Sequence, residues 1–265
     1  MIVGFIGVGN LASSVISGMR KSDSFKKTML FLFDNYPEKA KAFQNEYTIV
    51  CSSEAEVIAN SDCIFIAIKP ADFETTLKTI RDTAELTGKF FVSTAAAVTT
   101  EYISSRLGGA PVVRTMPNLP IANGFGATAV CGGQGIDDKQ IQFVCDIFGA
   151  SGICVILPEE QMNKVIAVNG SSPAYVYIFV KAMADWAVLN GFDEKVARQL
   201  VAQSFKGSAE MILKSDTSLD DLVKAVCSPG GTTTEAVKVF NESDFGDVIS
   251  KAMDACTAKA ELLKK

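Results

Sequence analysis

The stretch Ile2-Val3-Gly4-Phe5-Ile6-Gly7-Val8-Gly9-Asn10-Leu11-Ala12 decides how this chain folds. Its first five residues form an apolar run that is typical of a short buried strand, and an amphipathic helical pattern begins directly after Gly9. Gly7 permits the tight turn between these elements, Gly9 lets a ligand approach the backbone, and Ala12 permits close packing of the helix on the strand. A G-x-G-x-x-A spacing at a strand-to-helix junction therefore predicts a site for the pyrophosphate of a dinucleotide.

Short apolar runs alternate with amphipathic helical stretches over residues 1–157. This alternation predicts a parallel sheet with right-handed crossovers, an α/β doubly wound sheet of the Rossmann type. The strands that we expect are residues 2–6, 29–33, 63–68, 90–93, 112–115, 127–131 and 154–157.

The strand signal stops near residue 158, which predicts a second, all-helical domain. Its expected helices are residues 159–167, 173–189, 193–213, 218–227, 232–240 and 245–263. We therefore expect a dinucleotide-binding domain over residues 1–157 and a helical domain over residues 158–265. The helix over 173–189 is apolar on most of its surface, so we expect it to be buried nearly all round, partly by a partner chain. The alternative is burial among its own neighbours in the same chain. Because it contains Lys181 and Asp185, it is a poor candidate for a membrane span.

Composition narrows the possible functions. The formal net charge is −5 and there is no dense basic stripe, which argues against nucleic acid as a partner. The seven cysteines lack the spacing of a metal or disulfide framework, so we expect them to be reduced, with no metal site. The chain has no histidine, which excludes a histidine general base and a Ser-His-Asp triad. The sequence begins directly as a strand, without the features of a signal peptide, so we expect a cytoplasmic protein.

A second glycine-rich turn, Ser228-Pro229-Gly230-Gly231-Thr232-Thr233-Thr234-Glu235, opens the helix expected over 232–240. Glycine lets successive backbone N–H groups converge, and the helix start adds unpaired donors and the positive end of its dipole. Such a turn is suited to a carboxylate or a phosphate. The alternative is a helix closed by a capping box between Thr232 and Glu235.

Other strand ends contribute to the predicted dinucleotide site. Asp34 closes the second strand about 20 residues after the glycine loop, where an acidic residue holds the adenosine ribose hydroxyls and favours NAD over NADP. A solvated turn aspartate is the alternative, and Asn35 beside it leaves room for a 2′-phosphate. The segments 66–70 and 92–97 end at the same crevice, where Lys69 is placed to contact a phosphate unless it is an ordinary surface lysine.

These features occur in one order together with further blocks of familiar sequence. The blocks are Lys69-Pro70, Arg114-Thr115-Met116-Pro117-Asn118-Leu119-Pro120, Gly170-Ser171-Ser172-Pro173-Ala174-Tyr175, the stretch from Gln203 to Met211, and Val226-Cys227-Ser228-Pro229-Gly230-Gly231-Thr232-Thr233. With them the chain resembles the pyrroline-5-carboxylate reductase family over its full length.

The resemblance implies a Rossmann domain followed by an all-α dimerisation domain, in a homodimer or a higher oligomer built from dimers, with an active site shared by two chains. It implies reduction of the C=N bond of 1-pyrroline-5-carboxylate to L-proline, the last step of proline biosynthesis, with NADPH or NADH. The family usually has Gly where Ser172 stands, Thr or Ser where Leu119 stands, and often Asn near Glu54. Because Glu54 and Asp34 are acidic, a 2′-phosphate would be repelled, and the choice between the two cofactors stays open.

The same resemblance assigns expected roles to residues. The turn Ser228, Gly230, Gly231, Thr232 and Thr233 is expected to bind the substrate carboxylate, with Thr233 or a water that it orients donating a hydrogen bond to the ring nitrogen. The residues expected to contact the cofactor are Gly7, Gly9, Asn10, Leu11, Asp34, Asn35, Ala67, Lys69, Pro70, Ala95, Met116, Pro117 and Asn118. A cyclic imine is basic enough to take a proton from solvent, so the absence of histidine fits this reaction, in which geometry contributes most of the catalysis.

Three alternatives remain at the level of sequence. A β-hydroxyacid dehydrogenase shares the nucleotide domain but uses a lysine with an asparagine about three residues later on one helix face, whereas Lys164 and Asn169 are five apart. A reductase of another imine is the second alternative, because it needs the same cofactor site and the same kind of reaction geometry. A regulatory protein that binds NAD(P) without catalysis is the third alternative, because a fold alone does not fix a function.

Overall fold

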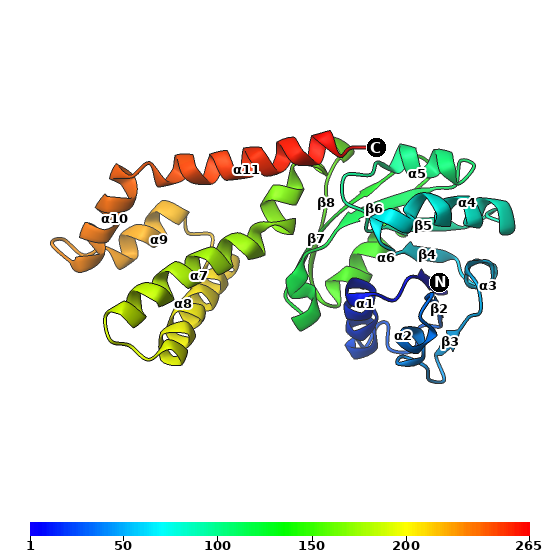
Figure 1. Ribbon diagram of the computed structural model, residues 1–265, viewed down its shortest axis with the longest axis horizontal. Helices are drawn as coiled ribbons and strands as arrows, with labels where there is room; N and C mark the ends of the chain where they lie inside the picture. The colour runs from blue at the N-terminus through cyan, green and yellow to red at the C-terminus, as the bar shows by residue number, and fades with distance from the viewer. The chain divides into compact units, whose positions relative to one another are not determined.

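The computed structural model describes residues 1–265, apart from the side chain of Pro70. The chain packs into two compact units, which we call the sheet unit (Met1–Ser171 with Cys256–Lys265) and the helical unit (Ser172–Ala255) (Figure 1). The sheet unit thus extends past the domain boundary expected near residue 157 and takes in the end of the last helix. Where the chain leaves and re-enters the sheet unit, the Ser171 hydroxyl lies 3.3 Å from the Cys256 sulfur.

The sheet has eight strands in the order β3-β2-β1-β4-β5-β6-β7-β8. The strands are β1 (Val3–Ile6), β2 (Leu30–Phe33), β3 (Thr48–Val50), β4 (Cys63–Ile66), β5 (Phe90–Ser93), β6 (Val112–Met116), β7 (Gly126–Gly132) and β8 (Gly152–Ile156). All seven expected strands are present, and the three-residue edge strand β3 was missed. The doubly wound order places β1 and β4 side by side at the centre, where the strand order reverses.

The expectation of a wholly parallel sheet is wrong for its last two strands. The six strands β1 to β6 are mutually parallel. β7 pairs antiparallel with β6, and β8 then runs parallel to β7. The connection from β6 to β7 holds only a short 3₁₀ helix, Leu119–Asn123. It is too short for a crossover, so the chain reverses instead.

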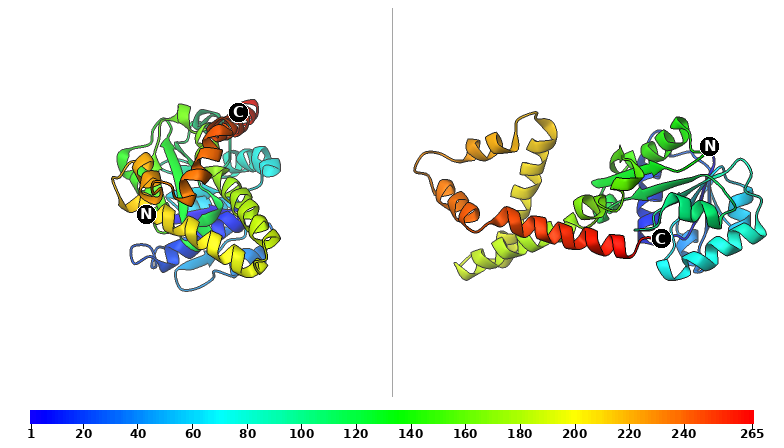
Figure 2. Two further views of the ribbon diagram at one scale, coloured as in Figure 1. Left: turned by 90° about the vertical axis from the view of Figure 1, so that its left-hand side faces the viewer. Right: turned by 90° about the horizontal axis from the view of Figure 1, so that it is seen from above.

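Helices cover both faces of the sheet (Figures 1 and 2). They are α1 (Asn10–Lys21), α2 (Pro37–Lys41), α3 (Glu54–Ala59), α4 (Phe73–Thr83), α5 (Thr100–Arg106) and α6 (Asp138–Gly149). Val3 and Phe5 of β1 face a core shared with α1 and α6, while Ile64 and Ile66 of β4 face a core shared with α3, α4 and α5. Successive strand residues point to opposite faces, so strands covered on both sides must be apolar throughout.

The segment after β8 departs from the expected helix over residues 159–167. It forms a 3₁₀ turn, Glu159–Gln161, and then a π-helix, Ile166–Gly170. Met162 and Val165 of this segment are buried against Ala129 and Cys131 of β7. The segment therefore belongs to the sheet unit, and a π-turn of this kind is often found at functional sites.

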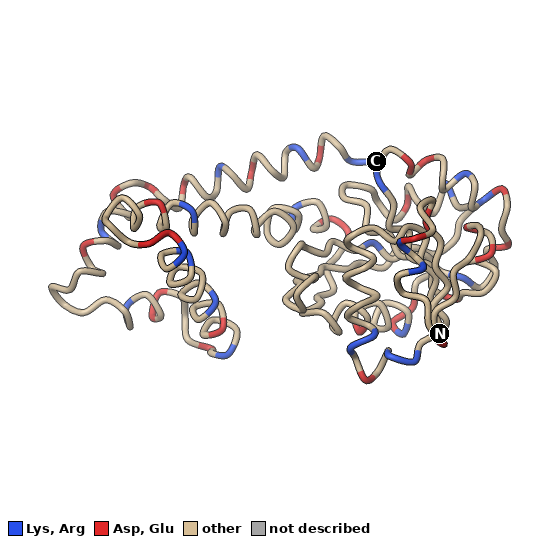
Figure 3. Tube along the Cα trace, turned by 60° about the horizontal axis from the view of Figure 1, so that its bottom comes forward, with Lys and Arg blue, Asp and Glu red and all other residues tan. Residues whose placement is uncertain are grey.

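The helical unit contains α7 (Ser172–Leu189), α8 (Glu194–Lys214), α9 (Leu219–Val226), α10 (Thr232–Glu242) and the first part of α11 (Phe245–Leu262). The expected helices are all present here. Charged residues of both signs are interspersed along these helices (Figure 3). The helix α7 differs from the others in its many apolar side chains. None of the described helices is both long and apolar enough to cross a membrane.

Within one chain none of the described residues of α7 is buried, so burial of this helix among its own neighbours is wrong. Ile178 is 68% exposed, Trp186 65% and Leu189 87%. A groove of about 1130 Å³ runs between α7 and α8, with Val176 and Phe205 among its lining residues. An apolar surface of this extent is typical of a surface that another chain covers.

Replacing Ile178 with Asp should therefore dissociate the oligomer, because an ionised carboxylate in an apolar interface is strongly unfavourable. Sedimentation velocity should show a monomer for Ile178→Asp. Gln134→Asp, which adds the same charge at an exposed position of the sheet unit, should keep the oligomeric state of the unmodified chain. An unchanged sedimentation coefficient for Ile178→Asp would show that this face is not an interface.

Candidate active site

The glycine loop after β1 has the geometry that its sequence predicts. Gly7 has a φ of 90°, and a β-carbon there would lie 2.5 Å from the Ala67 carbonyl oxygen, so only glycine fits. A β-carbon on Gly9 would meet no described atom within 4 Å, which leaves its backbone open to a ligand. Gly9 is also the N-cap of α1, whose first turn contains Asn10 and Leu11. The first-turn N–H groups lack intrahelical acceptors, so this loop is able to bind an anion.

Asp34 holds the glycine loop to the end of β2. Its carboxylate accepts hydrogen bonds from the Val8 N–H (2.7 Å) and the Tyr36 N–H (2.9 Å), and Lys39 Nζ lies 3.5 Å away. The Asp34 side chain is only 10% exposed, so the alternative of a solvated turn aspartate is wrong. The bond to Val8 is a role that sequence reasoning missed, while the predicted contact with the adenosine ribose stays a prediction.

Other predicted cofactor contacts lie at neighbouring strand ends. Ala67 follows β4 and donates its N–H to the Ile6 carbonyl at 2.9 Å, which continues the pairing of β1 with β4. Asn35 and Lys69 are exposed. The side chain of Pro70 lies outside the described residues. Exposed positions at the ends of adjacent parallel strands are accessible to a bound nucleotide.

A loop follows β5 at the same edge of the sheet. Ser93 ends β5, and its Oγ accepts a hydrogen bond from the Ala95 N–H at 3.2 Å. Thr115 of β6 donates its hydroxyl hydrogen to the Ser93 carbonyl at 3.0 Å. The half-buried Ala95 is therefore bonded to Ser93 at the end of β5, and Ser93 is in turn bonded to β6.

The turn after β6 is cross-linked by two asparagine side chains. Asn118 Oδ1 accepts the Ala127 N–H (2.9 Å), and Asn118 Nδ2 donates to the Asn169 carbonyl (3.1 Å). Asn169 Nδ2 in turn donates to the carbonyls of Met116 and Ala127, each at 2.7 Å. The Asn118 amide, predicted to contact the cofactor, thus holds this turn to β7 and to the π-helix.

Asn169 holds the turn that contains Met116 and Asn118, two predicted cofactor contacts. Sequence reasoning considered Asn169 only as a rival catalytic residue. Its neighbour Gly170 approaches Met116 closely, because a β-carbon there would lie 2.5 Å from the Met116 methyl carbon. An asparagine followed by glycine at the end of an apolar helical run was the available signal.

The second glycine-rich turn belongs to the helical unit. Gly230 has a φ of 69°, and the Gly231 N–H donates to the Ser228 carbonyl at 2.9 Å. The Thr234 hydroxyl donates to the same carbonyl at 2.9 Å. Gly231 is the N-cap of α10, so the capping box of Thr232 with Glu235 does not form. The first-turn N–H groups of α10 are left for a ligand, as an anion site requires.

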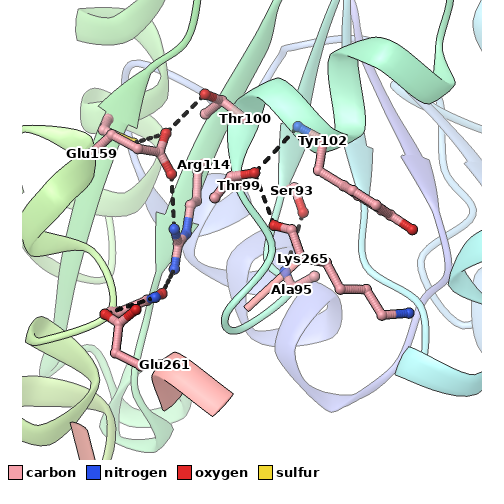
Figure 4. A network of polar contacts seen from close by, with 11 residues as sticks. Ser93, Ala95, Thr99, Thr100, Tyr102, Arg114, Glu159, Glu261 and Lys265 are labelled. Atoms are coloured by element: carbon pink, nitrogen blue, oxygen red, sulfur yellow. Dashed lines mark hydrogen bonds and ion pairs between the residues drawn. The ribbon is translucent and has the colours of Figure 1, made fainter. Parts of the chain in front are cut away.

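Arg114 forms a buried polar network that the sequence did not reveal (Figure 4). Its guanidinium is 2% exposed and donates from Nη1 to Glu159 Oε1 (2.8 Å) and from Nη2 to Asn163 Oδ1 (2.6 Å). The other carboxylate oxygen of Glu159 accepts the Thr100 hydroxyl (2.8 Å) and the Cys131 thiol (3.2 Å). An arginine inside the apolar strand β6 indicates a buried charge that needs a carboxylate, but which carboxylate pairs with it cannot be chosen from the sequence.

The network keeps Glu159 ionised. Burial by itself would raise the pKa of Glu159, but hydrogen bonds from Arg114, Thr100 and Cys131 and the Arg114 charge outweigh it and lower that pKa. The Cys131 thiol has a raised pKa, first because it is buried and then because Glu159 is negative. The pair is therefore Arg⁺ with carboxylate⁻, and the cysteine stays a neutral donor.

Glu159→Gln should lower the free energy of unfolding by about 3 kcal/mol at neutral pH, because it leaves the buried Arg114 charge without its counter-ion. Since the pKa of Glu159 is depressed in the folded state, its contribution is present above the unfolded pKa of about 4.3 and is lost as pH falls through the folded value. Urea unfolding at several pH values should show this loss in the unmodified chain, a weaker loss in Glu159→Gln, and wild-type behaviour in the exposed neighbour Glu160→Gln. Equal pH profiles for Glu159→Gln and the unmodified chain would contradict the assignment.

Comparison with known proteins matches both halves of the chain to family models. Residues 159–263 match the family model described as pyrroline-5-carboxylate reductase dimerisation, and residues 2–97 match NADP oxidoreductase coenzyme F420-dependent. The pyrroline-5-carboxylate reductase of Escherichia coli (strain K12) is 34% identical over 265 residues, covering 99% of this chain and 98% of the relative. The chain belongs to the pyrroline-5-carboxylate reductase family.

Solved structures of the pyrroline-5-carboxylate reductase family share the whole fold. The enzyme from Coxiella burnetii superposes with a TM-score of 0.93 at 28% identity, covering 99% of this chain and 98% of that one. A Plasmodium falciparum pyrroline carboxylate reductase with NADP bound gives a TM-score of 0.86 at 27% identity, covering 100% and 98% of the two chains. The family, the Rossmann-type sheet and the helical dimerisation domain expected from the sequence are thereby confirmed.

Proposed function

We propose that this chain reduces the C=N bond of 1-pyrroline-5-carboxylate to give L-proline, with hydride from NADPH or NADH. The observation that carries this proposal is the likeness to named pyrroline-5-carboxylate reductases over both units and 99% of the chain. The two anion-binding turns support it, since one suits a dinucleotide pyrophosphate and the other suits a carboxylate.

The proposed cofactor site lies along one edge of the parallel strands. Gly7, Gly9 and the first turn of α1 bind the pyrophosphate. Asp34 binds the adenosine ribose, and the ends of β4, β5 and β6 line the nicotinamide half. The nicotinamide supplies the hydride when bound, and the chain's own task is to orient it and exclude competing positions.

The proposed substrate site is the turn from Ser228 to Thr233. The N–H groups at the start of α10 hold the carboxylate, and the Thr233 hydroxyl donates a hydrogen bond to the carboxylate or, through water, to the ring nitrogen. The imine takes its proton from solvent, so no histidine is needed. We further propose a cytoplasmic homodimer, or a higher oligomer built from dimers, in which two chains together complete the active site.

A β-hydroxyacid dehydrogenase reaction is disfavoured by the position of Asn169. That reaction needs an asparagine amide beside a catalytic lysine, whereas the Asn169 amide nitrogen donates to the Met116 and Ala127 carbonyls. Lys164 precedes the π-helix and is five residues away. A non-catalytic NAD(P)-binding protein is distinguished by experiment.

The direct test follows oxidation of NADH and of NADPH by absorbance with DL-pyrroline-5-carboxylate, beside a sample without imine. Substrate-dependent oxidation is the expected result. A folded sample that binds NAD(P)H but oxidises neither cofactor would contradict the proposal and favour the regulatory alternative.

Thr233→Ala should raise the KM for pyrroline-5-carboxylate about tenfold or more, because a hydrogen bond to a charged group contributes about 1.5–3 kcal/mol. Thr233→Ser keeps the hydroxyl and should stay close to the wild-type KM. Steady-state kinetics at saturating cofactor measures both. If Thr233→Ala leaves KM unchanged, Thr233 does not bind the substrate.

Asp34→Asn should raise kcat/KM for NADPH relative to NADH about tenfold, because it removes a negative charge that would repel the 2′-phosphate. The single amide oxygen can still accept the Val8 N–H that holds the glycine loop, at the cost of the bond from the Tyr36 N–H. Asp138→Asn, at an exposed position of α6, is the matched control for loss of one charge. An unaltered NADPH to NADH ratio in Asp34→Asn would show that Asp34 does not select the cofactor.

A further inference from the structure

The loop between β5 and α5, residues 94–99, contains a residue in an unfavourable backbone conformation. Ala97 has a φ of 61°, in the left-handed region that side-chain-bearing residues rarely adopt. Ala97 is also only 2% exposed, so protein groups and not solvent surround it. Such a conformation persists only where neighbouring groups hold it, and it is often found at functional loops.

The main chain of Lys265 holds this loop (Figure 4). Its N–H donates to the Ala97 carbonyl at 3.0 Å. Its carbonyl accepts the Thr99 N–H at 3.0 Å and the Thr99 hydroxyl at 2.9 Å. The same Thr99 oxygen accepts the Tyr102 N–H at 3.2 Å as the N-cap of α5. Residue 265 therefore fixes the loop on both sides of residue 98.

The end of α11 reaches the same place by a second route. Glu261 accepts a hydrogen bond from Asn163 Nδ2 at 3.1 Å, and Asn163 is joined through Arg114 and Glu159 to Thr100, the first residue of α5. Ala260 is buried at 5% exposure. Two independent sets of polar contacts thus hold the end of α11 to the start of α5.

The other end of the loop is fixed by the Ser93 bond to the Ala95 N–H and by Thr115 of β6. Residues 95 and 96 therefore lie between two fixed points, at the carboxyl end of a parallel strand. In this fold such a position faces the bound ligand.

We propose that Lys265 acts, through its main chain, as a positioning residue that holds Ala97 in its left-handed conformation and so sets the affinity for the nicotinamide half of the cofactor. Lys265 itself is not a catalytic residue. The inference rests on the proposed function only in taking Ala95 as a cofactor contact. The contact is made three residues after the end of α11, a helix that begins in the helical unit and ends in the sheet unit.

The test compares Lys265→Pro with Lys265→Ala. Both variants lose the lysine side chain and its ion pair with Glu74 at 3.7 Å, but only proline also removes the N–H that binds Ala97. Fluorescence titration should give a Kd for NADH about five- to tenfold higher in Lys265→Pro than in Lys265→Ala. The Kd for ADP-ribose, which lacks nicotinamide, should differ less than twofold. Equal Kd values for NADH in the two variants, or equal losses for both ligands, would overturn the proposal.

A second substitution separates the loop conformation from a general loss of stability. Glycine adopts a positive φ without the steric cost that alanine has. Ala97→Gly in the Lys265→Pro background should therefore recover at least half of the lost NADH affinity on a logarithmic scale, and no recovery would contradict the role of Ala97. Because these are binding measurements, a chain that binds NADH but does not reduce the imine would refute the proposed function and leave this inference intact.

Discussion

The buried ion pair of Arg114 with Glu159 is the interaction on which the rest of the structure depends. A guanidinium inside a sheet is tolerated only when a carboxylate and further acceptors surround it. Satisfying it here draws in the segment after β8 through Glu159 and Asn163, the start of α5 through Thr100, and the end of α11 through Glu261. One desolvated charge therefore links the segment after β8, the start of α5 and the end of α11 to strand β6.

The two units have different physical requirements. The sheet unit has an apolar core on each face of the sheet, so it buries its apolar strand residues within one chain. The helical unit leaves α7 without a buried residue, so a single chain does not give it a core. The turn at Gly230, which we propose as the substrate site, lies in this unit, and residues 159–263 match a dimerisation family model. Under this proposal, substrate binding depends on assembly of the oligomer.

The sequence predicted what depends on local pattern. The strands and helices were predicted from the periodicity of apolar residues. The loop at Gly7 was predicted from the glycine spacing, because glycine adopts a positive φ easily. What it did not predict depends on contacts between distant residues. The reversal of β7 follows from a short connection, and the Asn118 amide proved to bind Ala127 and Asn169 in the folded chain.

The geometry of the candidate site was predicted only in part, for the same reason. The backbone requirements at Gly7 and Gly230 could be predicted, since each has a positive φ in the structure. The partners of Arg114 could not, because several carboxylates satisfy the same electrostatic need in a sequence. The bond from the Val8 N–H to Asp34 was also missed, since it joins residues that only the sheet brings together.

Transfer of the hydride is the most direct test of the central claim. The chain is incubated with nicotinamide cofactor deuterated at both C4 positions and with pyrroline-5-carboxylate, and the product is analysed by mass spectrometry and chiral chromatography. We expect L-proline that carries one deuterium on the ring carbon that bore the C=N bond. Oxidation of the cofactor without labelled proline, or no reaction in a chain that binds the cofactor, would contradict it.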